Sequence, residues 1–187
     1  MMIKSLQTGF TLIEMLITIA VLAILIGIGV GSYESLFKSN QLRGSNESIH
    51  SLIAYAKSES VKINGQVSVN FAAGANGNWC VGLFQVAGGT ETCDCNTANS
   101  CAIDGREIKL DGKDFNKVTL VVDSMTNNRV VFDPKRGMPK TGDLLGNVVV
   151  KSGTGADESS IKIIVNTIGN ITQTCKTGSS SSYAACS

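Results

Sequence analysis

Six cysteines, all beyond residue 79, are the side chains of this 187-residue chain whose spacing could do chemistry. Their even number and loop-like surroundings predict disulfides in an oxidising compartment. Cys175 and Cys186 flank the polar segment KTGSSSSYAA, and a bridge between them would hold a tail that otherwise frays. The other group could instead form a four-thiolate zinc site. Its members are Cys80, Cys93, Cys95 and Cys101.

The spacing within this second group favours disulfides over a metal site. The C-x2-C spacing of zinc knuckles is absent, so no metal or other cofactor is predicted. Cys93 and Cys95 have one residue between them, which is too tight for an easy mutual bridge. Two pairings remain open: Cys80–Cys93 with Cys95–Cys101, or Cys80–Cys95 with Cys93–Cys101.

A single carboxylate, Glu14, lies near the start of an apolar run from Phe10 to Gly31. At about 1.5 Å per residue, this run is long enough for a bilayer core of about 30 Å. A charged side chain in hydrocarbon costs roughly 2.5–3.5 kcal/mol on insertion scales, so Glu14 should have a partner. The polar leader MMIKSLQTG precedes the run, and no A-x-A site follows it, which argues against an ordinary secretory signal.

No group of residues indicates an enzyme. The chain lacks GxSxG, HExxH, EF-hand and Walker sequences. The only histidine, His50, falls on a predicted helix, where a solvent-facing position is expected rather than that of a catalytic base. Asp104 and Asp111 are each followed by glycine and predict turns, while Trp79 and Phe84 are expected in the core.

The elements that must position these residues are one long helix and a β-rich region. Helical spacing of apolar residues predicts a helix from about Phe10 to Ile63, with Asn64-Gly65 as its stop. From Gln66 onward, short β-like runs alternate with glycine, asparagine and aspartate clusters. The runs are VSVNF, WCVGLFQV, VTLVV, RVVFD, NVVV and IKIIV. They predict an α+β fold in which the helix packs on an antiparallel sheet.

The charge balance gives no general field for nucleic acid. The formal net charge is +1, and without Lys4, which precedes the apolar run, 15 basic residues balance 15 acidic ones. The only compact basic cluster is Lys135, Arg136 and Lys140, for which a solvated turn is the favoured interpretation.

The segment GFTLIE, Gly9 to Glu14, resembles the processing site of type IV pilins and type II secretion pseudopilins. The resemblance implies that a prepilin peptidase cuts between Gly9 and Phe10 and methylates the new N-terminus at Phe10. Glu14 can neutralise the resulting amine, in its own helix or in a neighbouring subunit, and would therefore be an assembly determinant.

The glycines near the end of the apolar run allow two interpretations. Many pilins have a helix-disturbing proline where this chain has Gly31, and Gly27 and Gly29 alternate with it here. The resemblance implies a segment that can melt or stretch in a filament. Close packing of helices through small residues is the alternative.

A narrower resemblance covers the head. QLRGSNESIHSLIAYAKSESVKING, WCVGL and FDPKRGMPKTG look like the FimT/FimU group of minor pilins, relatives of the H pseudopilin of type II secretion. Phe132 and Gly137 fit its F-x-x-x-x-G motif, and IGNITQTC, from Ile168 to Cys175, fits its glycine-led C-terminal strand. DNA-binding members carry arginines after that glycine, whereas this chain has Asn170, Thr172 and Gln173. Nucleic acid is therefore not an expected partner.

The resemblance implies four segments: a cleaved leader, a transmembrane and assembly helix, its amphipathic continuation, and a globular β-rich head. Their residues are 1–9, 10–31, 32–65 and 66–187. The implied function is a minor pilin that primes assembly of a type IV pilus and enters it near the tip. A type II secretion pseudopilin and a DNA receptor for natural transformation are the alternatives, with a plain membrane-anchored binding domain as a third.

The resemblance also implies location and partners. The chain would sit in the inner membrane as a single-pass protein with its head in the periplasm, and then move to the pilus tip at the cell surface. Its partners would be other minor pilins, the major pilin, the prepilin peptidase and the inner-membrane assembly machinery.

Overall fold

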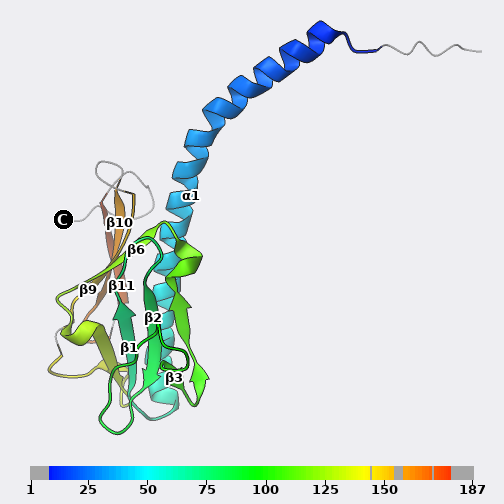
Figure 1. The fold of residues 1–187 in the computed structure, drawn as a ribbon. Coiled ribbons are helices and arrows are strands. Elements are labelled where there is room, and N and C mark those ends of the chain that lie inside the picture. Colours follow the sequence, from blue (N-terminus) through cyan, green and yellow to red (C-terminus); the bar gives the residue numbers. More distant parts are fainter. Residues whose placement is uncertain (1–8, 144, 154–157, 170, 178–187) are drawn as a thin grey trace, which may run out of the picture. The chain divides into compact units, whose positions relative to one another are not determined.

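The computed structural model describes residues 9–143, 145–153, 158–169 and 171–177. The chain divides between Phe37 and Lys38 into two compact units, of which the second is the head with the helical residues that pack on it (Figure 1). The leader up to residue 8, Cys186 and the side chain of Cys175 lie outside the described part. The predicted Cys175–Cys186 bridge therefore stays a prediction.

One helix, α1, runs from Leu12 to Lys62, within two residues of the predicted bounds at each end. It continues without a break through Gly27, Gly29 and Gly31. At its end Asn64 takes a left-handed backbone angle of φ 49°, and the Gly65 N–H donates to the Ser60 carbonyl at 3.1 Å. This closing turn satisfies a carbonyl that the helix leaves unpaired.

Over the described residues, α1 included, the structure contains no helix that is apolar over enough length to cross a membrane.

The strands form two larger sheets and a hairpin, all with antiparallel pairing. The first sheet has the order β5-β2-β1-β7-β8, with β1 Val67–Ala72, β2 Cys80–Gln85, β5 Lys109–Asp111, β7 Arg129–Asp133 and β8 Met138–Pro139. The second has the order β11-β10-β9-β6, with β6 Val118–Asp123, β9 Asn147–Ser152, β10 Ser159–Val165 and β11 Ile171–Thr177. The hairpin pairs β3 Ala102–Ile103 with β4 Arg106–Glu107, and short 3-10 helices cover Gly112–Phe115 and Thr126–Asn128.

The predicted fold, an α+β arrangement of a helix packed on antiparallel β structure, is confirmed, and the structure adds that the described strands divide between two larger sheets. The runs VTLVV and RVVFD are neighbours in sequence, yet β6 pairs with β9 while β7 pairs with β1. Alternation of apolar and polar residues predicts that a segment is a strand, but not which other strand it pairs with. The sequence therefore could not assign the strands to two sheets. Asp104-Gly105 forms the predicted turn between β3 and β4, with φ values of 50° and 74°.

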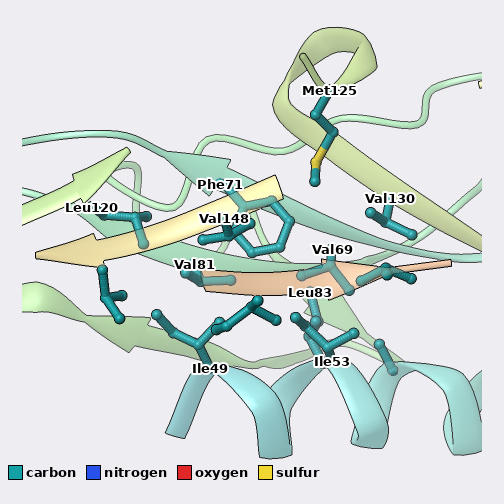
Figure 2. Packing of buried hydrophobic residues seen from close by; sticks show 14 of the residues in the cluster. Ile49, Ile53, Val69, Phe71, Val81, Leu83, Leu120, Met125, Val130 and Val148 are labelled. Carbon is teal, nitrogen blue, oxygen red and sulfur yellow. The ribbon is translucent and has the colours of Figure 1, made fainter. Parts of the chain in front are cut away.

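The head is held by a large apolar core to which α1 and both larger sheets contribute. Ile49 and Ile53 point from α1 into a cluster with residues of both sheets, among them Val69, Val81 and Leu120 (Figure 2). Each fully buried aliphatic side chain of this kind contributes roughly 1.5–3 kcal/mol. The core therefore fixes the second half of α1 to the head.

Most, but not all, core predictions are confirmed. Trp79 is buried, and its indole N–H donates to the Val118 carbonyl at 3.0 Å. Phe84 is only half-buried, and His50 is also half-buried rather than fully solvent-facing. The buried residues of α1 include the polar Asn46 and Glu59, whose burial the spacing of apolar residues did not predict.

Candidate assembly sites at the helix start and on the head

The first candidate site is the start of α1. Gly9 and Phe10 precede the helix without regular secondary structure, and both are exposed, Phe10 by 81%. The Glu14 backbone N–H donates to Thr11 Oγ1 at 3.3 Å, so Thr11 caps the helix. Thr11 and Glu14 have the T-x-x-E spacing of a capping box, a signal in the sequence that can be recognised once the helix start is known. Glu14 also lies where the helix dipole favours a negative charge.

Around Glu14 the helix of the first unit is covered with exposed apolar side chains. Leu12, Ile13 and Met15 are each at least 60% exposed, and the same character continues to Ile26. Exposed apolar surface of this extent marks a membrane or protein contact. Glu14 is exposed within this surface and is its one acidic group.

The second site is the cysteine-bridged loop after β2. Cys80 is bonded to Cys95 and Cys93 to Cys101, with Cα atoms 6.0 and 5.2 Å apart. This is the second of the two pairings that the spacing allowed. The four sulfurs are engaged in disulfides, so none of them is a thiolate that could hold zinc.

Gly82, on β2, lies directly beneath these two bridges. A Cβ atom on it would lie 2.3 Å from Cys101 Sγ and 3.0 Å from Cys95 Cβ. Cys101 is fully buried, so its sulfur has no free space into which it could move. Gly82 is the glycine of WCVGL, and sequence reasoning missed its role beneath the bridges. A glycine inside a strand is a general signal of such a close approach.

The same loop is tied to the first sheet by charge. The Glu91 carboxylate accepts hydrogen bonds from Arg129 on β7 and from Lys140, which follows β8. The Arg129 side chain is only 8% exposed, and Asp143 lies 3.9 Å from it. The hydrogen bond from Lys140 is the main cause of the lowered pKa of Glu91, and Arg129 adds to it against the opposing effect of burial.

These contacts correct the interpretation of the predicted basic cluster. Lys140 is paired with Glu91, whereas Lys135 and Arg136 are exposed in the turn between β7 and β8. The three cations therefore do not form one solvated group.

Replacing Glu91 with glutamine should destabilise the head by about 3 kcal/mol at neutral pH, because Arg129 keeps its charge in a buried position. The lowered pKa means that the Glu91 contribution is present above the unfolded value near 4.5 and is lost as pH falls through the folded value. Denaturant unfolding of both proteins between pH 3 and pH 7 measures this.

The difference between wild type and Glu91→Gln should shrink as the pH falls through that window. Glu158→Gln is the matched control, since Glu158 makes a half-exposed ion pair with Lys151 and should change little. A constant difference at every pH would show that charge pairing is not what Glu91 contributes.

The third site joins the two glycines of the head motifs to α1. Lys57 Nζ donates to the Gly169 carbonyl at 3.0 Å. A Cβ on Gly137 would lie 2.9 Å from Lys57 Cγ, and one on Gly169 would lie 2.8 Å from the Gly137 carbonyl oxygen. Both glycines have left-handed φ values, 60° and 72°. Lys57 lies within the predicted helix, and its contact with Gly169 could not be inferred from the sequence pattern.

Comparisons with known proteins agree with this architecture. The family described as "Type II transport protein GspH" matches residues 45–169, and the "Prokaryotic N-terminal methylation motif" matches residues 4–30. A search of curated proteins gave no match.

Among solved structures, the head is similar to the type IV minor pilin FimU of Pseudomonas aeruginosa strain PAO1. The TM-score is 0.50 at 16% identity, over 72% of this chain and 89% of that one. At that identity the likeness shows the fold. The predicted resemblance to type IV pilin-like minor pilins is confirmed, and the chain belongs to the family of the type II transport protein GspH.

Proposed function

We propose that this chain is a minor pilin that primes assembly of a type IV pilus and is incorporated near its tip. The observation that carries the proposal is the exposed apolar surface of α1 around a single carboxylate, Glu14. Such a surface needs lipid before assembly and neighbouring helices after it. Proteins of the pilin and pseudopilin families are structural components rather than enzymes.

The proposal assigns a step to each part of the chain. Residues 1–9 are a leader that is removed after Gly9, and residues 10–31 hold the chain in the inner membrane with the head in the periplasm. The amine at Phe10 is methylated and pairs with Glu14. The helix then leaves the membrane for a filament made with the major pilin and other minor pilins.

A type II secretion pseudopilin is the second candidate, and the family match over residues 45–169 favours it. The DNA-receptor alternative has less support. Lys140 is engaged by Glu91, which leaves Lys135 and Arg136 as the exposed cations of that turn, too few for strong binding to phosphates.

Deleting the gene and scoring surface pili, secreted proteins and DNA uptake separately tests the proposal. Loss of surface pili with normal protein secretion supports a pilus subunit. Loss of secretion with normal pili would favour the pseudopilin, and loss of DNA uptake alone would favour the receptor.

Complementing that strain with Gly9→Val should not restore pili, because the bulkier residue blocks leader removal. Intact-mass measurement should then find residues 1–9 still attached, whereas the wild-type chain should begin at methylated Phe10. Gly65→Ala, at a glycine where a Cβ meets only ordinary contacts of 3.4 Å or more, is the control and should restore pili. A wild-type chain that still begins at Met1 would overturn the proposal.

A further inference from the structure

Gly169, between β10 and β11, is hydrogen-bonded through both its backbone groups and follows an exposed apolar side chain. The Gly169 N–H donates to the Asn166 carbonyl at 2.9 Å, and the Gly169 carbonyl accepts from Lys57 Nζ at 3.0 Å. The Gly169 backbone is also packed against that of Gly137. Ile168 precedes this fixed glycine and is nevertheless 61% exposed.

Other exposed groups lie in the same region of the head as Ile168. Arg136 precedes Gly137, so the short approach of the two glycines places the Cα atoms of Arg136 and Ile168 within roughly 15 Å of each other. Val61 follows Lys57 by one helical turn on the same face of α1, and it is 51% exposed. We name Val61, Lys135, Arg136 and Ile168 the turn patch.

The turn patch combines exposed aliphatic side chains with two exposed cationic side chains. Lys135 and Arg136 are exposed, and within the described part of the chain neither makes an ion pair. The third cation of that segment, Lys140, is held by Glu91. An exposed isoleucine gains roughly 1.5–3 kcal/mol when it is fully buried.

We propose that the turn patch is a docking surface for a neighbouring protein subunit that presents carboxylates beside an aliphatic side chain. Val61 and Ile168 would be buried by the aliphatic part, and Lys135 and Arg136 would pair with the carboxylates and steer the approach. Two cations neutralise about two phosphates, and two aliphatic side chains contribute nothing to a phosphate contact, so the patch fits protein better than DNA. The partner class rests on the proposed function, which supplies neighbouring subunits.

The test is photo-crosslinking of the full-length chain in cells that make the filament. A benzophenone amino acid is placed at Ile168, and cross-linked products are identified by mass spectrometry. A covalent adduct with a pilin-like subunit is expected, and Lys135→Glu with Arg136→Glu should reduce its yield by about tenfold. Lys117→Glu, at an exposed lysine elsewhere on the head, should leave the yield unchanged.

Two further positions separate this inference from the proposed function. A benzophenone at Val121, which is 37% exposed on β6, controls for nonspecific contacts, and one at Ile19 reports on packing of the apolar helix. Adducts with subunits at Ile19 but none at Ile168 would overturn the docking surface and leave the proposed function standing. Absence of adducts at both would overturn both. Equal yields at Val121 and Ile168, insensitivity to charge reversal, or a nucleic-acid adduct at Ile168 would each overturn the docking surface.

Discussion

Replacing Glu14 with glutamine is expected to lower incorporation into filaments by at least about tenfold while membrane association and leader removal stay normal. An amide keeps the size and part of the hydrogen bonding of the carboxylate, but it cannot neutralise the amine at Phe10. A buried charge left without its partner costs several kcal/mol. The measurement is the ratio of this subunit in sheared filaments to that in membranes, by quantitative immunoblot.

Two companion variants show how Glu14 acts. Glu47→Gln makes the same change at an exposed glutamate further along α1 and should incorporate as wild type does. Thr11→Ala removes the hydroxyl that accepts from the Glu14 N–H and so tests the capping contribution alone. If Thr11→Ala reproduces the loss and Glu14→Gln does not, the site serves helix capping rather than charge pairing.

Replacing Gly82 with alanine should prevent the two bridges above it from forming together. The added Cβ would lie 2.3 Å from Cys101 Sγ and 2.8 Å from Cys101 Cβ, distances that no rotation of a buried cystine relieves. Loss of a bridge that closes a loop of this size costs about 3 kcal/mol, so the head should unfold at lower denaturant concentration. Alkylation of the unreduced protein, followed by peptide mapping, should find free thiols among Cys80, Cys93, Cys95 and Cys101.

Gly65→Ala provides the matched control for this change. Its Cβ would meet only atoms of Ile63 at 3.4 Å and beyond, and its φ is not left-handed, so stability should change little. Complete pairing of the four cysteines in Gly82→Ala, with an unchanged unfolding midpoint, would show that the loop adapts and that Gly82 is not required beneath it.

The helix and the class of the fold could be predicted because their signals are local. The apolar run and the helical spacing of apolar residues from Ile49 to Ile63 predicted α1. Asn64-Gly65 predicted the end of the helix to within two residues. The disulfide alternatives were also local, because the closeness of Cys93 and Cys95 in sequence excluded one of the three pairings. The choice between the remaining two pairings depends on how the loop after β2 folds back over Gly82. The spacing of the cysteines in the sequence carries no information on the path of that loop.

The sites that were missed all depend on contacts between distant segments. Glu91 and Arg129 are 38 residues apart, and Lys57 and Gly169 are 112 apart. A buried cation and an exposed one look alike in a sequence, so the pairing of Lys140 and the separation of Lys135 and Arg136 needed the three-dimensional arrangement. The division into two sheets has the same origin, because strand partners are chosen across the fold.

The two bridges over β2 have a consequence for proteolysis of the head. Their spans overlap, Cys80 to Cys95 and Cys93 to Cys101, so any single cut between residues 80 and 101 falls inside at least one covalent ring. A nicked head would therefore keep both fragments linked and its β2 strand in place. A protease that cleaved this loop at the exposed stretch from Ala87 to Thr90 would therefore release no part of the head.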